Sequence, residues 1–301
     1  MSSKFASLYK LAESIPPIPV AIVSPESKVA LEGAVLAAKE KSIVPILVGE
    51  LKSIQRFAAS INVDISAFQC VDVPAKGIMP ATIDLAKAGK IKAIMKGSLH
   101  TDELMGAIVS SESGMRTSRR MSHCMIIDIP AYHKILILTD AALNINPVFK
   151  EKKNIIQNAV DLAHSMGIAL PKVALVTAAE TITENMPETF EYAALCKMAE
   201  RGQIEGALLD GPLSLDLAIS PQSVATKKMA SKVAGDADIL VVPNIAAGNI
   251  LTKALDYFAN ALTFGLILGA KIPIVLTSRS ADAKARAGSA MLAKFYATHN
   301  K

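Results

Sequence analysis

The stretch AIMKGSLHTDELMGAIVS, residues 93–110, shows the pattern that decides the fold class. Residues 93–96 are a short apolar run typical of a buried strand, and residues 102–110 have the spacing of an amphipathic helix. A loop containing glycine and hydroxyl residues joins the two elements. A strand followed by such a helix is the first half of a crossover connection between parallel strands.

The same alternation continues along the chain. Further apolar runs predict strands at residues 20–24, 43–48, 67–71, 125–129, 135–139, 173–177, 207–210, 239–242 and 274–277. Further amphipathic stretches predict helices at residues 26–41, 80–88, 154–166, 190–201, 222–233 and 282–298. Strands connected through such helices predict an α/β protein with parallel or mixed sheets and helices on both faces.

Composition and charge limit the classes of function. The chain has 301 residues, is 51% hydrophobic and 4% aromatic, and fits one large or two medium domains with an aliphatic core. The net charge of +5 is dispersed, which favours a small anionic ligand over a nucleic acid. Residues 258–278 are interrupted by Lys271 and Pro273, so we interpret them as a buried helix followed by a buried strand and expect no membrane contact.

Cysteine usage and motif absences narrow the classes further. Cys70, Cys124 and Cys196 have no CxxC spacing, which gives no support for zinc or a disulfide framework and is typical of a cytoplasmic protein. The N-terminal segment lacks the apolar stretch of a signal peptide. The sequence also lacks GxGxxG, GxxxxGK(S/T), GxSxG and HExxH, so we predict no nucleotide loop, nucleophile elbow or metal site.

In open α/β sheets, ligands bind beyond the carboxyl ends of the strands. The residues that follow several predicted strands are small and polar, and some are glycine: 96–102, 139–140, 210–212, 243–244 and 277–279. We therefore expect these segments to line a cleft.

The loop KGSLHTD, residues 96–102, offers groups for an anion. Gly97 would let the backbone approach a ligand, and Ser98 and Thr101 would donate to a phosphate or acyl oxygen at a helix N-terminus. The alternative is that Thr101 only caps the helix.

The loop GMRTSRR, residues 114–120, concentrates arginines Arg116, Arg119 and Arg120 beside hydroxyl groups. One guanidinium group can donate two parallel hydrogen bonds to phosphate oxygens, so one or two of these arginines would hold phosphate. The alternative is a solvated basic loop.

The segment PIVLTSRSADAKARAG, residues 273–288, joins a predicted strand to an alanine-rich helix. Arg279 lies at the strand exit and Asp282 near the helix start, an arrangement that suits acid–base chemistry beside an anion. The alternative makes Asp282 an N-cap and Arg279 a surface charge. Asn249 is likewise expected to cap the helix that follows Gly248.

Five segments of the chain, taken in their order, resemble the phosphate acetyl/butyryl transferases. They are KGSLHTDELMGAIV, GMRTSRRMSH, LLDGPLSLDLAIS, AGDADILVVPNIAAGNILTKAL and GAKIPIVLTSRSADAKA. The resemblance implies conversion of acyl-CoA and phosphate to acyl phosphate and CoA, with the CoA thioester as substrate and no metal or redox cofactor. It implies a two-domain fold like that of isocitrate and isopropylmalate dehydrogenases, and a homodimer. The expected domains are residues 1–131 plus 265–301 and residues 132–264, with the active site in the cleft between them.

The resemblance also implies roles for site residues. Ser278 and Arg279 match the family's serine–arginine pair at the CoA thiol end, and Asp282 falls where the family has its catalytic aspartate. Arg116 matches a basic residue of the family's arginine–threonine loop, which we assign to phosphate. The other residues expected to bind substrate are Thr117, Ser98, His100, Thr101 and Asn249.

Residues 73–79, VPAKGIM, lack the arginine of the acetyl-specific branch, which favours the shorter butyryl-type members and leaves the acyl group as butyryl or acetyl. We expect direct transfer without a covalent acyl-enzyme, because no cysteine lies at a predicted strand exit. The alternatives are a non-catalytic protein that binds CoA or acyl phosphate, and an NAD(P)-dependent hydroxyacid oxidative decarboxylase of related fold.

Overall fold

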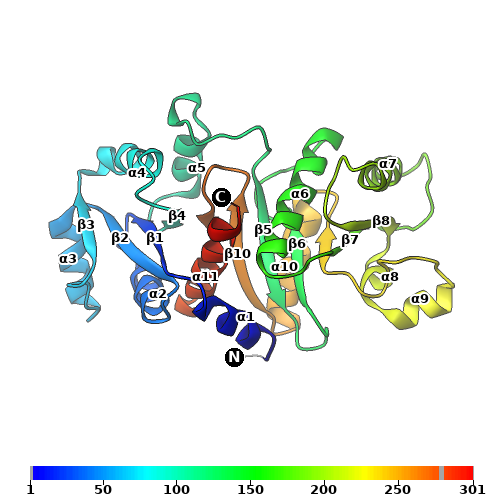
Figure 1. Cartoon of the computed structure of the whole chain (residues 1–301), viewed down its shortest axis with the longest axis horizontal. Helices are drawn as coiled ribbons and strands as arrows, with labels where there is room; N and C mark the ends of the chain where they lie inside the picture. The colour runs from blue at the N-terminus through cyan, green and yellow to red at the C-terminus, as the bar shows by residue number, and fades with distance from the viewer. Residues whose placement is uncertain (1–2, 278–280, 301) are drawn as a thin grey trace. The chain divides into compact units, whose positions relative to one another are not determined.

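The computed structural model describes residues 3–277 and 281–300. The chain forms two compact units (Figure 1). The mid-chain unit comprises Met1–Ala6 and Arg120–Thr263, and the terminal unit comprises Ser7–Arg119 and Phe264–Lys301.

The boundary between the units differs from the one that we predicted. After Ser7, the chain leaves the terminal unit between Arg119 and Arg120, rather than between residues 131 and 132, and it returns between Thr263 and Phe264. The reason is that β5 (Ser122–Asp128) pairs antiparallel with β6 (Ile135–Thr139), so its hydrogen bonds hold it in the mid-chain unit.

The terminal unit contains strands in the order β3-β2-β1-β4-β11-β10. The strands are β1 (Ile18–Val23), β2 (Ile43–Gly49), β3 (Gln69–Asp72), β4 (Ala93–Lys96), β10 (Leu262–Leu268) and β11 (Ile274–Val275). All neighbours are parallel except β10 and β11. The helices are α2 (Lys28–Lys39), α3 (Leu51–Ser60), α4 (Ile78–Lys87), α5 (Thr101–Val109) and α11 (Ala283–His299), with 3-10 turns η1 (Ala75–Gly77) and η2 (Ser111–Ser113).

The mid-chain unit contains strands in the order β5-β6-β9-β7-β8. Its remaining strands are β7 (Lys172–Val176), β8 (Leu208–Leu213) and β9 (Ile239–Val241), and every pair apart from β5 and β6 is parallel. Its helices are α6 (Phe149–Ser165), α7 (Glu188–Glu200), α8 (Leu215–Ile219), α9 (Pro221–Lys227) and α10 (Ile245–Phe258). Helix α1 (Ser3–Glu13) begins in this unit and ends in the terminal unit.

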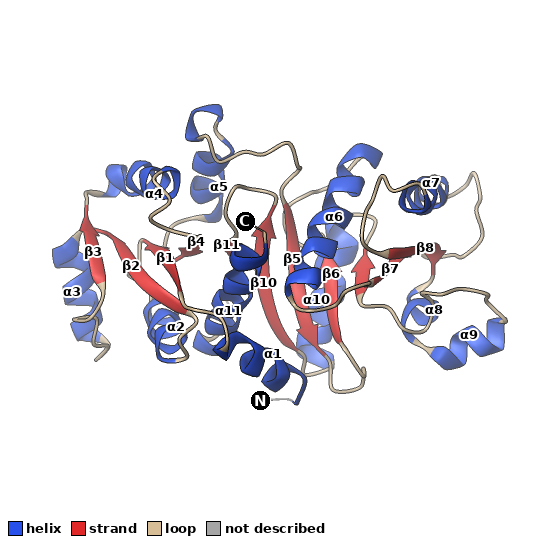
Figure 2. Ribbon diagram, viewed as in Figure 1, coloured by secondary structure: helices blue, strands red, loops and turns tan. Residues whose placement is uncertain are grey.

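These elements confirm the predicted α/β class with mostly parallel strands. Helices α2 and α4 both contact β2, and Figure 2 shows them on opposite sides of that strand. Such covering explains why the strands read as continuous apolar runs: Val20, Ala21, Ile22 and Val23 of β1 are all fully buried. Burying one aliphatic side chain of this size contributes about 1.5–3 kcal/mol.

Two predicted elements are wrong. Residues 262–268 form strand β10 rather than part of a helix, because the preceding helix ends before Asn260, which has a left-handed φ of 49°. The sequence Leu262–Leu268 contains threonine, phenylalanine and isoleucine, which favour strands. The helix expected at 222–233 stops at Lys227, since Lys228 has a φ of 52°. Among the described residues, no helix is long and apolar enough to cross a membrane.

Candidate active site

Strands β1, β4 and β11 end at the same edge of the terminal unit, which we call the carboxyl edge. Val23 pairs with Lys96, and Met95 pairs with Val275, in parallel register. The segments that follow these three strands therefore leave the sheet side by side. The predicted residues Ser278 and Arg279 lie outside the described residues and come shortly after β11 in the sequence.

The loop after β4 is held by backbone hydrogen bonds to the loop after β1. The backbone N–H of Gly97 donates to the Val23 carbonyl at 2.8 Å, and that of Ser98 donates to the Ser24 carbonyl at 2.7 Å. A Cβ atom at Gly97 would overlap the Ser24 carbonyl oxygen. Gly97 is therefore required by a neighbouring loop, whereas we predicted that a ligand required it.

The hydroxyl of Ser98 donates to the Ser24 carbonyl at 3.1 Å. In this state Ser98 can accept a hydrogen bond from a ligand but cannot donate one to phosphate. Binding phosphate through this hydroxyl would require it to rotate away from Ser24.

Helix α5 begins at Thr101, with His100 as the residue before it. The side chain of His100 makes no capping hydrogen bond, and Thr101 lies inside the helix, so Thr101 is not the predicted cap. Both Asp102 and Glu103 lie in the first turn and are exposed. These carboxylates complement the helix dipole and oppose an anion at this end, so the start of α5 is a poor phosphate site.

Two cations lie near the β4 exit. The Lys96 ammonium donates to the Leu99 carbonyl at 2.8 Å and to the Gly97 carbonyl at 3.3 Å, which closes the loop around it. Nη1 of Arg286 donates to the Lys96 carbonyl at 2.7 Å. We did not predict Arg286, because a single arginine in an alanine-rich helix reads as a surface charge; the structure buries it.

Asp282 is the N-cap of α11. Its Oδ1 accepts a hydrogen bond from the Ala285 N–H at 2.8 Å, and its side chain is exposed. This is the capping alternative that the sequence left open, and an exposed carboxylate at this position also remains accessible to a substrate.

The loop of Arg116 and Thr117 lies at the opposite edge of the terminal unit. The backbone of Arg116 forms an isolated antiparallel β-bridge with that of Ala270, and the Thr117 hydroxyl donates to the Gly269 carbonyl at 2.6 Å. Gly269 and Ala270 precede β11, whose direction matches that of β4, so this turn lies where β4 begins. The structure does not bring Arg116 together with Ser98 and Thr101, as the shared phosphate site that we predicted requires.

The neighbouring arginines differ in their contacts. Nε of Arg120 donates to Oδ1 of Asn144 at 2.7 Å, and Nη1 lies 3.3 Å from Glu151. Asn144 in turn donates to the buried Asp140 carboxylate at 2.6 Å, so Arg120 is part of a structural network. Arg116 is exposed and makes no ion pair within the described part of the chain, which leaves its guanidinium available for an anion.

The carboxyl end of β9 leads into α10, whose cap is not the residue that we predicted. Oδ1 of Asn244 accepts from the Ala247 N–H at 3.0 Å, whereas Asn249 lies inside the helix and is exposed. A Cβ at Gly248 would lie 2.7 Å from the Asp140 carbonyl oxygen. Gly248 therefore allows α10 to pack on the backbone that follows β6.

Asp210, Gly211 and Pro212 also differ from the prediction. They lie within β8, which continues to Leu213, rather than in a turn beyond its end. The pairing of β7 and β8 shifts register between Ala174 and Val176. Since β8 is the last strand in the order, its proline removes no hydrogen bond from a further strand.

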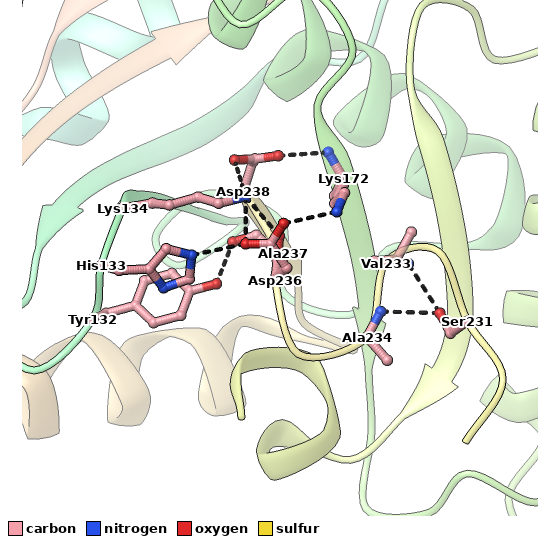
Figure 3. A network of polar contacts seen from close by, with 10 residues as sticks. All are labelled: Tyr132, His133, Lys134, Lys172, Ser231, Val233, Ala234, Asp236, Ala237 and Asp238. Carbon is pink, nitrogen blue, oxygen red and sulfur yellow. Dashed lines mark hydrogen bonds and ion pairs between the residues drawn. The ribbon is translucent and has the colours of Figure 1, made fainter. Parts of the chain in front are cut away.

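Asp236 and Asp238, which precede β9, belong to a network of polar contacts at the amino ends of β6, β7 and β9 (Figure 3). Asp236 accepts from His133 at 2.8 Å, pairs with Lys134 at 2.8 Å and accepts from Lys172 at 2.7 Å. Burial would raise the pKa of Asp236, but the hydrogen bonds from Lys134, Lys172 and His133 outweigh it and lower the pKa below its ordinary range. Asp238 pairs with Lys134 at 3.0 Å. This network therefore stabilises the strand ends opposite the exits of β6 and β9.

Comparisons with known proteins identify relatives over nearly the whole chain. The family model described as Phosphate acetyl/butaryl transferase matches residues 76–293. A phosphate acetyltransferase of Rickettsia felis is 44% identical, over 99% of this chain and 86% of its own length. A phosphate butyryltransferase of Clostridium beijerinckii is 37% identical over the full length of both.

Solved structures share the fold. A branched-chain phosphotransacylase from Enterococcus faecalis V583 is 30% identical, with a TM-score of 0.81 over 93% of this chain and 99% of its own. A Salmonella typhimurium protein provisionally assigned as a 4-hydroxythreonine-4-phosphate dehydrogenase is 14% identical with a TM-score of 0.58, which bears on the fold alone and agrees with the expected dehydrogenase-like architecture. The chain belongs to the phosphate acetyl/butaryl transferase family.

Proposed function

We propose that the protein is a phosphate acyltransferase that interconverts acyl-CoA and phosphate with acyl phosphate and CoA. The observation that carries this proposal is the carboxyl edge of the terminal unit, where the exits of β1, β4 and β11 meet beside Lys96, Arg286 and the start of α11. Cationic groups at this edge suit substrates that carry phosphate and a leaving group that becomes a thiolate.

In the forward direction, a phosphate oxygen attacks the thioester carbonyl carbon, a carbon–oxygen bond forms, and the carbon–sulfur bond breaks. Positioning two bound substrates supplies much of the rate in such a reaction. We assign the departing thiolate to Arg279 and Ser278, which match the family's serine–arginine pair. Asp282 accepts the thiol proton of CoA in the reverse direction, and in the forward direction it passes to sulfur the proton that the attacking phosphate loses.

Arg116 and Thr117 belong to the proposed phosphate-binding set through the family resemblance alone, because their loop lies at the opposite edge of the terminal unit from the exits of β4 and β11. The hydroxyl groups of Ser98 and Thr101, the ring of His100 and the amide of Asn249 belong to the proposed binding set through the family resemblance.

The cysteines support direct transfer without an acyl-enzyme. Burial raises the pKa of the Cys124 thiol to about 12, and burial together with Asp210 raises the pKa of Cys196 to about 12. Burial raises the pKa of Cys70 as well, with Asp72 and Glu26 adding to the effect. A thiol must ionise to act as a nucleophile, so these groups are poor acyl acceptors at neutral pH.

The acyl group is short, butyryl or acetyl, because relatives of both names match the chain. The test measures thiol release from acetyl-, propionyl- and butyryl-CoA, with and without phosphate. Release that requires phosphate supports the proposal and ranks the acyl groups. A protein that binds CoA but releases no thiol would contradict it.

We further propose that the protein is a cytoplasmic homodimer. The described cysteines are free, as expected in a reducing compartment. Helix α10 and the residue that opens β10 expose large apolar side chains: Ile250 at 69%, Tyr257 at 70%, Phe258 at 90% and Leu262 at 44%. Ile250 and Tyr257 are seven residues apart and share one helix face, which a second copy would cover. Phe258→Glu should convert the dimer to a monomer in light scattering, and an unchanged mass would rule out this face.

A further inference from the structure

Arg286 is a buried cation at the carboxyl edge that the proposed chemistry does not use directly. It lies in the first turns of α11, its side chain is almost fully buried, and its Nη1 donates to the Lys96 carbonyl at 2.7 Å. No carboxylate pairs with it among the described residues, and its Nε has no hydrogen-bond acceptor there. Burying a guanidinium whose N–H groups lack acceptors lowers the stability of the fold, so an arginine at this position calls for a functional explanation.

The backbone around Arg286 is shaped to hold its side chain. A Cβ atom at Gly33 would lie 2.7 Å from Cβ of Arg286 and 3.3 Å from the Ala283 carbonyl oxygen. Helix α2 therefore approaches α11 closely at this point, and any larger residue at Gly33 would push Arg286 aside. Close packing of this kind fixes the stem of the side chain and aims its guanidinium.

The group that Arg286 contacts connects directly to the candidate site. Lys96 is the last residue of β4, and the two residues after it bond to the backbone of Val23 and Ser24. On its own helix, Arg286 follows the cap Asp282, which accepts a hydrogen bond in the first turn of α11. One side chain thus ties the loop after β4 to the start of α11.

We propose that Arg286 is a positioning residue for acyl transfer. It fixes the β4 exit against the start of α11, and so sets the spacing between the loop after β4 and the cap Asp282. The inference rests on the proposed function, since positioning has meaning only if acyl transfer occurs at this edge. A displacement of about 1 Å in such a site can lower the rate about a hundredfold.

Lys294 provides a matched control on the same helix. It is buried like Arg286, and its Nζ donates to the Ala12 carbonyl at 2.7 Å and to the Lys41 carbonyl at 3.0 Å. Both cations therefore join α11 to backbone carbonyls. Ala12 lies in the last turn of α1, and Lys41 follows α2 just before β2 begins. Both lie away from the carboxyl edge, so loss of Lys294 should weaken the fold without moving the site.

The experiment compares Arg286→Met with Lys294→Met. Unfolding midpoints, kcat, and KM for phosphate and for acyl-CoA are measured in the thiol-release assay. Both variants should unfold more easily than wild type. Arg286→Met should lose kcat by more than about tenfold, as expected for a displaced site. Lys294→Met should keep kcat within about twofold, since its contacts lie outside the site.

Equal kcat in the two variants would overturn the inference, because loss of a buried cation would then act only on stability. Wild-type protein that shows no phosphate-dependent thiol release would instead contradict the proposed function, and the two failures are distinguished within one assay.

A second pair of variants serves if Arg286→Met does not fold. Gly33→Ala displaces Arg286 without removing any polar group, and Gly106→Ala in α5 adds a methyl group where nothing lies within 4 Å. Gly33→Ala should lower kcat by more than about threefold while Gly106→Ala keeps the wild-type value, a smaller loss than for Arg286→Met because the guanidinium remains. Wild-type kcat in folded Gly33→Ala protein would overturn the inference.

Discussion

The carboxyl edge of the terminal unit and the network around Asp236 balance their charges in different ways. Around Asp236, the side chains of His133, Lys134 and Lys172 bond to a carboxylate that they share. At the carboxyl edge, Arg286 bonds only to a backbone carbonyl among the described residues, so its positive charge is not compensated there. Paired charges stabilise a fold, whereas a buried cation that bonds to a backbone carbonyl can hold a loop in the position that acyl transfer needs.

The largest expected effect is that of replacing Arg279. Arg279→Gln removes the cation that we assign to the departing thiolate, and it should lower kcat by more than about tenfold, in line with the loss of one electrostatic group in a transition state. Circular dichroism should remain unchanged. Wild-type rates in this variant would show that the thiolate leaves without help from Arg279.

Asp282→Asn separates catalysis from capping. Asparagine caps a helix about as well as aspartate, so the free energy of unfolding should stay within about 0.5 kcal/mol. If the carboxylate transfers the thiol proton, kcat should fall about tenfold or more. Asp282→Ala should lose both activity and about 1 kcal/mol of stability. A fully active Asp282→Asn enzyme would reduce Asp282 to the cap that the structure shows.

A stability effect without a rate effect is expected at Asp236. Asp236→Asn removes the shared carboxylate and should cost about 1–2 kcal/mol, a value kept low because the side chain is partly exposed. Chemical denaturation measures the loss, and kcat of the folded variant should match wild type. A large loss of kcat with normal stability would contradict this prediction, because it would mean that the network around Asp236 takes part in catalysis.

The smallest effect is the pH dependence of that difference. The pKa of Asp236 is lowered in the folded state, so its contribution to stability is present above the unfolded value of about 3.9 and is lost as pH falls below it. The difference in stability between wild type and Asp236→Asn should therefore shrink below about pH 4. A difference that stays constant down to pH 2 would mean that the depressed pKa does not stabilise the fold.

The sequence predicts a structural feature well when that feature depends on neighbouring residues, and poorly when it depends on contacts between distant parts of the chain. Strands β4 and β6 match their predicted bounds, because each is a short apolar run with polar residues after it. Strand β10 was missed because the apolar sequence continues from α10 across Asn260, and only the backbone turn there separates the two elements.

The site shows the same limit. The exits of β4 and β11 could be predicted to meet, since parallel strands end at one edge. The position of Arg116 could not, because it depends on the antiparallel pairing of β10 with β11, which turns Ala270 toward the other edge. Arg286 was missed because its burial arises from the close approach of α2 at Gly33, a tertiary contact without a local sequence signal.

The most direct test of the central claim is thiol release from butyryl-CoA and acetyl-CoA with and without phosphate, followed by mass spectrometry of the protein. Direct transfer predicts release only when phosphate is present, formation of an equal amount of acyl phosphate, and no acylated protein when acyl-CoA is mixed with the enzyme alone. Thiol release without phosphate, or a burst of acylated protein, would contradict direct transfer to phosphate at this site.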